Sequence, residues 1–315
     1  MSTPESRHPV MVYAVKLLIS GAVVAFLIHR FDVADAARQL AMVEPWHAAA
    51  AALLYGGVHV INAAKLQILM PQRRVRTVLA FVLVAQAYSL LLPGQLAGEA
   101  VKAYRLARGG GEGGRVASSV AFDKMTSLAA LLLTTLGGLL VESHRFGNTL
   151  LPTLLGGLAL IAAMAGLLAL ERVRRLALAL LSGSGWRGRL GGPVAAFFDT
   201  WTHHATRPRA LALSLAYGVA GQSIQAVATW ILGAGLGIDL SLALWCVIIG
   251  ALTIVLLAPL SIGGLGLREA SLIGLLGLFA VAPDRALAIA FAILAFQLLV
   301  TVVGLLVDLL VLRDH

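Results

Sequence analysis

Charged residues are scarce in this chain, and that scarcity decides its broad class. They make up 12% of its 315 positions, well below the roughly 25% of a soluble domain. With 59% apolar residues and a mean hydropathy of +0.91, the chain has too little polar surface to face water on every side. Its single cysteine, Cys246, excludes a disulfide framework within the chain. The composition also excludes fibrous and disordered classes, so lipid is expected to be its main solvent.

Apolar runs of membrane-spanning length recur along the sequence, and each is predicted to form a transmembrane helix. They cover residues 9–29, 46–69, 116–141, 150–170, 210–235 and 286–312. The first run carries Lys16 and has no convincing cleavage site of small residues, so it is interpreted as a helix rather than a signal peptide. The predicted fold class is therefore an all-α polytopic membrane protein with six spanning helices.

Two further apolar stretches, 78–106 and 242–279, are interrupted by proline and glycine. Proline removes a backbone donor and clashes with the preceding turn, so each stretch is expected to break there. A broken backbone at membrane depth persists only inside protein or beside a watery cavity. We therefore expect each stretch to form a re-entrant hairpin that returns to the side it entered from. The expected hinge residues are Pro93, Gly94, Gly98, Pro259, Gly263, Gly264 and Gly266.

The arginine distribution predicts the orientation in the membrane. If both stretches are hairpins, the arginine-rich segments 73–76, 105–115 and 171–209 all fall on one side, which is expected to be the cytoplasm. Both termini are then cytoplasmic, and the halves 1–170 and 210–315, joined by the basic linker 171–209, form an inverted pseudo-repeat. We interpret the net charge of +9 as contact between arginine-rich loops and the anionic leaflet of a bacterial inner membrane, and not as nucleic-acid binding.

Six ionisable side chains lie in or beside the broken stretches. They are Glu99, Lys102, Asp123, Lys124, Arg268 and Glu269. Each would cost about 2.5–3.5 kcal/mol near the bilayer centre if left bare. We therefore expect one buried polar cluster between the two hairpins and the helix over 116–141. Glu99 and Lys102, three residues apart, fit either a local structural pair or half of an anion site. Asp123 and Lys124 fit either a helix-packing contact or a role in the same site.

No metal, cofactor or nucleophile site is expected from the residue pattern. His203 and His204 are adjacent but have no third ligand nearby in the sequence. The glycine-rich segment 109–114 lacks the Lys-Ser/Thr ending of a phosphate loop. The chain is accordingly not expected to be an enzyme.

Three motifs resemble the transmembrane domain of lysylphosphatidylglycerol synthase/flippase proteins. The motifs are Leu92 to Glu99 followed by Lys102 and Arg105, Ala117-Ser118-Ser119 followed by Asp123-Lys124, and Pro259 to Glu269. The resemblance covers nearly all of residues 10–312. It implies a stand-alone member that moves a lipid or lipid-linked headgroup between leaflets.

From the charges and the resemblance together, we expect the chain to translocate an anionic lipid. The cations expected to bind the headgroup are Lys102, Arg105, Lys124 and Arg268. The acids expected to balance them or to carry protons are Glu99, Asp123 and Glu269. Three alternatives stay open: a secondary transporter of a small anion, a non-catalytic membrane subunit of a lipid-synthesis complex, and an enzyme that modifies a lipid headgroup. The sequence leaves homo-oligomer formation open.

Overall fold

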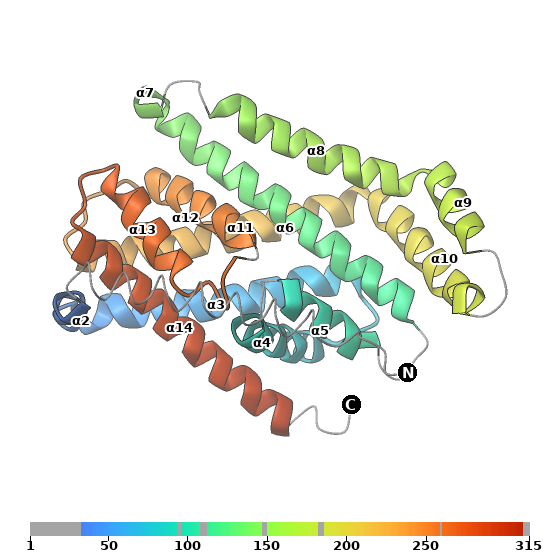
Figure 1. Cartoon of the computed structure of the whole chain (residues 1–315), viewed down its shortest axis with the longest axis horizontal. Helices are drawn as coiled ribbons and strands as arrows, with labels where there is room; N and C mark the ends of the chain where they lie inside the picture. The colour runs from blue at the N-terminus through green and yellow to red at the C-terminus, as the bar shows by residue number, and fades with distance from the viewer. Residues whose placement is uncertain are drawn as a thin grey trace, which may run out of the picture.

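The computed structural model describes residues 33–92, 96–107, 112–146, 150–181, 186–258 and 260–310. Within these ranges the regular elements are all helices, in agreement with the predicted class (Figure 1). The predicted first helix over 9–29 and the expected hinge residues Pro93, Gly94 and Pro259 lie outside the described residues.

Five of the described helices are long and apolar enough to cross a membrane. They are α3 (Pro45–Leu69), α6 (Gly113–Val141), α8 (Leu151–Ala169), α11 (Pro208–Gly235) and α14 (Pro283–Leu310). Each matches a predicted span to within a few residues. Three of them begin at a proline, which suits a first turn because the N–H that proline lacks has no helical acceptor there. The chain is thus a multi-pass membrane protein.

Two shorter helices each pack against the helix that follows them. α4 (Val75–Leu91) is followed by α5 (Leu96–Ala107), and we call them the first helix pair. A Cβ on Gly98 would overlap the carbonyl oxygen of Ala85, so the two helices touch backbone to backbone. At the other end Arg73 Nη2 donates to the Leu106 carbonyl at 3.2 Å. α5 therefore runs back along α4 and ends where α4 begins.

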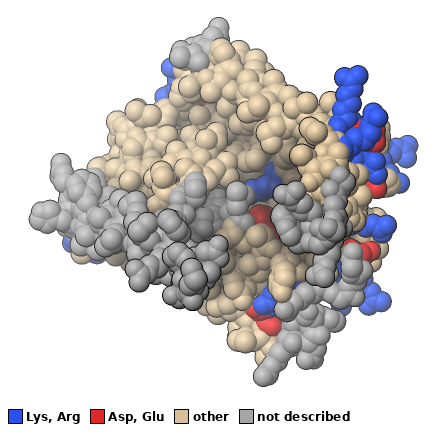
Figure 2. All heavy atoms as spheres, turned by 45° about the vertical axis from the view of Figure 1, so that its right-hand side comes forward, with Lys and Arg blue, Asp and Glu red and all other residues tan. Residues whose placement is uncertain are grey.

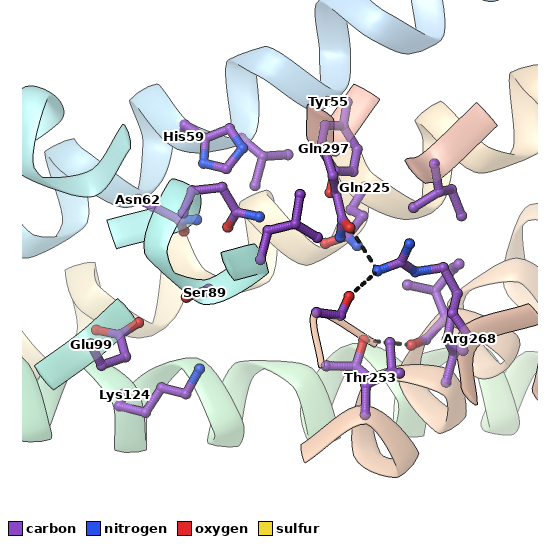
Figure 3. Close-up of a pocket in the computed structure, with 18 residues that line it drawn as sticks. Tyr55, His59, Asn62, Ser89, Glu99, Lys124, Gln225, Thr253, Arg268 and Gln297 are labelled. Carbon is purple, nitrogen blue, oxygen red and sulfur yellow. Dashed lines mark hydrogen bonds between the residues drawn. The ribbon is translucent and has the colours of Figure 1, made fainter. Parts of the chain in front are cut away.

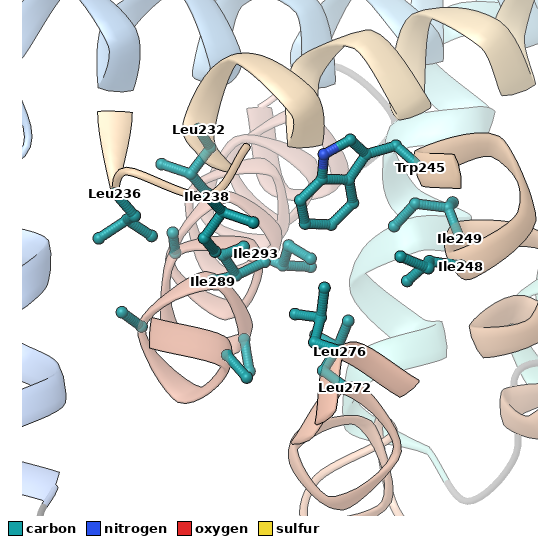
Figure 4. Packing of buried hydrophobic residues seen from close by; sticks show 14 of the residues in the cluster. Leu232, Leu236, Ile238, Trp245, Ile248, Ile249, Leu272, Leu276, Ile289 and Ile293 are labelled. Carbon is teal, nitrogen blue, oxygen red and sulfur yellow. The ribbon is translucent and has the colours of Figure 1, made fainter. Parts of the chain in front are cut away.

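The second helix pair consists of α12 (Leu242–Leu257) and α13 (Leu267–Gly277). The link between them contains Gly263, Gly264 and Gly266, all with positive φ, a conformation that glycine adopts without strain. Trp245, on α12, is fully buried in one cluster with Leu272 and Leu276 of α13 (Figure 4). The same cluster includes residues of α11 and α14, so the second pair sits in the largest apolar core described.

The remaining described helices are α2 (Val33–Ala41), α7 (Ser143–Phe146), α9 (Glu171–Leu180) and α10 (Trp186–Ala205). The last two show that the segment predicted as a basic linker is largely helical. α10 packs on α6 and α8: Trp201 is fully buried, its Nε1 donates to the Ala165 carbonyl at 2.9 Å, and its ring meets Phe122 edge to face at 5.1 Å. Part of the predicted linker, α10, thus packs against the membrane-spanning helices α6 and α8.

A hydrogen bond also joins α10 to α6. His204 Nε2 lies 3.0 Å from Ser119 Oγ, and both side chains are buried. Burial, with His203 and Arg207 nearby, lowers the pKa of His204 to about 4. The imidazole is therefore neutral at pH 7, which suits a ring packed against Phe122 at 5.4 Å.

Candidate functional site

Four charges of alternating sign link α3, α5 and α6; three of them are buried and Glu99 is partly exposed. Lys65 Nζ lies 3.2 Å from Asp123 Oδ1, and Asp123 Oδ2 lies 3.9 Å from Lys102 Nζ. Lys102 Nζ in turn lies 2.6 Å from Glu99 Oε2. We call this row of four residues the ionic chain. Two positive and two negative charges cancel, as buried charges at membrane depth require.

Lys65 is the member of the ionic chain that was not among the predicted site residues. Its side chain is 1% exposed, and besides the carboxylate it donates to the Asp123 backbone carbonyl at 2.8 Å and to Ser127 Oγ. The available signal was a lysine within an otherwise apolar helix. Glu99, Lys102 and Asp123 lie together as the sequence analysis expected of a cluster.

Arg105, expected to bind a headgroup, is engaged elsewhere. Its guanidinium forms a two-point ion pair with Asp308 on α14, one contact being Nη2 to Oδ2 at 3.0 Å. The Tyr88 hydroxyl donates to the same carboxylate at 3.2 Å. This geometry ties the first helix pair to α14 and occupies the arginine with a partner inside the protein.

A cavity of about 210 Å³ lies between the two helix pairs, and we call it the central cavity (Figure 3). Its walls also include residues of α3, α6, α11 and α14. Of the predicted site residues, the charged Glu99, Lys124 and Arg268 and the hinge Gly263 line it. Figure 3 places Glu99 and Lys124 on one side and Arg268 on the other. Lysine or arginine atoms and acidic atoms are also visible inside a hollow of the molecular surface in Figure 2.

Arg268 is the most deeply buried charge on this cavity, at 1% exposure. Its Nη2 donates to the Gly263 carbonyl at 2.9 Å and to Gln297 Oε1 at 2.6 Å. Its Nη1 is buried and has no hydrogen-bond partner, and no acidic side chain of the described residues lies within ion-pair distance. Gly264 leaves room for the guanidinium, since a Cβ there would come within 3.1 Å of Nη2. Among the described residues, Arg268 is thus a buried cation without an ion-pair partner.

Glu269 does not neutralise its neighbour. The side chain is 4% exposed, and neither carboxylate oxygen has a hydrogen-bond partner among the described residues. Successive residues of a helix point about 100° apart, so Arg268 and Glu269 face different neighbours. Glu269, which was expected to balance the cations or to carry protons, therefore makes no ion pair or side-chain hydrogen bond with a described residue.

Asp123 and Lys124 are also successive residues of one helix that face different neighbours. Asp123 belongs to the ionic chain, whereas Lys124 faces the central cavity and has no ion pair with a described residue. The cavity wall therefore carries Lys124 and Arg268 without a contacting acid, and Glu99, which already contacts Lys102. The balance on this wall favours an anion.

The expected hinge glycines have different roles in the structure. Gly98 permits close packing of the first helix pair, whereas Gly263, Gly264 and Gly266 form the left-handed link of the second. On the molecular surface, lysine and arginine atoms gather along one edge in Figure 2. Arg115 and Arg175 are exposed arginines, at 67% and 70% side-chain exposure.

Comparison with known proteins finds one family model, described as the lysylphosphatidylglycerol synthase TM region, which matches residues 13–304. No curated protein matches the chain.

Proposed function

The chain belongs to the family of the lysylphosphatidylglycerol synthase TM region, whose members have lipid-related roles in membranes, and from that premise we propose that it translocates an anionic lipid headgroup between the leaflets of a bacterial inner membrane. In this proposal the central cavity is the headgroup site. Lys124 and Arg268 bind the phosphate from opposite sides, and the ionic chain holds the first helix pair in position.

The observation that carries the proposal is the uncompensated Arg268. A buried guanidinium with a free Nη1 is costly unless an anion completes its shell. Guanidinium groups bind phosphate through N–H bonds, and Nη1 has no described partner that would have to be displaced for such a bond. A phosphate in the central cavity supplies the missing charge.

The lengths of the helix pairs support a re-entrant arrangement. With 17 residues, α4 is about 25 Å long, shorter than the roughly 30 Å hydrocarbon core. The contact of Arg73 with the end of α5 brings the chain back to its starting side. We therefore propose six spans, counting residues 9–29, with both termini and the arginine-rich segments in the cytoplasm. The two helix pairs would then admit a headgroup alternately from each leaflet.

Transport in liposomes tests this function. Arg268→Gln and Lys124→Gln are each expected to slow the exchange of fluorescent phosphatidylglycerol between leaflets by about tenfold to a hundredfold, because each leaves the phosphate one cation short. Arg285→Gln is the matched control: this arginine contacts the Gly237 carbonyl at the protein surface. Exchange at the wild-type rate in both cavity variants would overturn the site assignment.

One observation favours a second candidate, a secondary transporter of a small anion. The central cavity, at about 210 Å³, is smaller than the roughly 300–1,000 Å³ typical of ligand pockets and suits a small anion as well as a headgroup. Uptake of radiolabelled phosphate into the same liposomes, without lipid exchange, would support this candidate.

A further inference from the structure

The central cavity is lined by four side-chain amides. Asn62, Gln86, Gln225 and Gln297 come from four different helices and reach the same space; three of them are labelled in Figure 3. Hydroxyl groups of Tyr55, Ser89 and Thr253 line it too.

Three of these amides are available to a ligand. Gln297 accepts from Arg268, whereas the side chains of Asn62, Gln86 and Gln225 make no hydrogen bond to any described residue. Each amide offers two donors and one acceptor oxygen. An uncharged hydroxyl both donates and accepts, so it can pair with either end of an amide.

The charges of the cavity wall are unfavourable for an amine. Glu99 is the only acid among the described lining residues, and Lys102 already contacts it at 2.6 Å. Lys124 lies on the same side of the cavity as Glu99 (Figure 3). An ammonium group entering here would lose its water and meet two further cations, and the one acid on the described wall, Glu99, already has Lys102 as a partner.

Resting on the proposed function, we propose that the translocated headgroup is a phosphate bearing an uncharged, hydroxyl-rich group, such as a glycerol or a sugar, and that headgroups with an amine are excluded. The phosphate binds Arg268 and Lys124, and the hydroxyls bind the amides between them. A cavity of about 210 Å³ equals the volume of about seven waters, so it holds one small headgroup with the acyl chains outside.

Lipid binding to the full chain in detergent, measured by native mass spectrometry, tests the proposal. The probes share identical acyl chains: phosphatidylglycerol and phosphatidylinositol carry hydroxyls, phosphatidic acid carries phosphate alone, and phosphatidylethanolamine and lysylphosphatidylglycerol carry amines. We expect the hydroxyl-bearing lipids to bind at least about fivefold more tightly than each of the others, about the worth of one net hydrogen bond. Phosphatidic acid bears the greater phosphate charge, so charge alone would give the opposite order.

Variants separate the hydroxyl contacts from the anion contact. The double variant Gln86→Leu/Gln225→Leu is expected to bind phosphatidylglycerol and phosphatidic acid equally. Gln222→Leu is the matched control, since Gln222 lies on α11 three positions before Gln225 but is not among the residues that line the central cavity. Tight binding of either amine-bearing lipid, or an unchanged preference in the double variant, would overturn the proposal.

A wrong assignment of the anion site would give results that differ from those of a wrong headgroup assignment. If Arg268→Gln binds every lipid as the wild type does, the anion site is wrong, whatever the order among headgroups. Uptake of free glycerol 3-phosphate into liposomes is the last measurement. If glycerol 3-phosphate is taken up by liposomes containing the protein while phosphatidylglycerol is not exchanged, the headgroup chemistry holds and the lipid is not the substrate.

Discussion

At the scale of single residues, the ionic chain shows how a lysine is kept in an apolar helix. Lys65 is almost fully buried, and its ammonium contacts the Asp123 carboxylate, a backbone carbonyl and a hydroxyl. Removal of one partner from such a buried pair leaves the other charge without compensation, which costs more than the pair itself contributes.

Lys65→Met is therefore expected to lower the free energy of unfolding by about 3–5 kcal/mol. The measurement is the loss of folded protein in detergent as denaturant is added. Lys124→Met is the control, expected to cost less than about 1 kcal/mol because Lys124 has no ion pair with a described residue. Equal losses in the two variants would contradict a structural role for the ionic chain.

From the sequence it was possible to predict which charged residues would lie in one cluster. Which of them would form ion pairs was harder to predict. Glu99 and Lys102 were recognisable because a spacing of three places both on one helix face. The partnership of Lys65 with Asp123 spans 58 positions between two helices, and no local pattern contains that information. The separation of Arg268 from Glu269 follows from helix geometry, although their neighbours come from the tertiary fold.

At the scale of elements, Gly98 determines how closely the first helix pair packs. A Cβ there would overlap the Ala85 carbonyl oxygen and the Ser89 hydroxyl. A backbone atom cannot move aside as a flexible side chain can, so α5 itself would have to shift. Glu99 and Lys102 are on α5 and would shift with it.

Gly98→Ala is thus expected to destabilise the protein by about 1–3 kcal/mol through overpacking and to slow lipid exchange. Gly137→Ala on α6 is the control, because a Cβ at Gly137 meets nothing within 4 Å. In a helix interior alanine is favoured over glycine, so this control is expected to be neutral or stabilising by up to about 1 kcal/mol. Thermal unfolding of both variants is the measurement; a neutral Gly98→Ala would mean that the helices are not in close contact.

Long apolar runs and the proline and glycine breaks were sufficient to predict five spans and the two shorter pairs. The packing of α10 onto α6 and α8 was not predicted, because charged and small residues dilute its apolar face and Pro193 interrupts it. Tertiary contacts stabilise α10: Trp201 packs against Phe122, which is distant in the sequence.

At the scale of the whole molecule, α14 contacts both helix pairs. It packs against α4 of the first and α13 of the second, and Figure 1 shows it running along both. One connection is the ion pair of Arg105 with Asp308; another is the hydrogen bond of Arg268 with Gln297.

A double-mutant cycle measures the first connection. Arg105→Met and Asp308→Asn are each expected to destabilise the protein, and the double variant is expected to lose less than the sum, with a coupling energy of about 0.5–3 kcal/mol. Tyr88→Phe removes one hydrogen bond to the same carboxylate and is expected to cost about 0.5–1.5 kcal/mol. Strictly additive losses in the cycle would show that the contact contributes nothing to stability.

Because α14 contacts both helix pairs, a movement of one pair is expected to affect the other. If α14 tilts as the first helix pair moves, the tilt is transmitted to the second pair through the hydrogen bond between Gln297 and Arg268. Simultaneous opening to both sides would require α14 to bend, and it is an unbroken helix of 28 residues with proline only at its first position. In the proposed transport cycle, α14 would couple the movement of one helix pair to that of the other, because it contacts both.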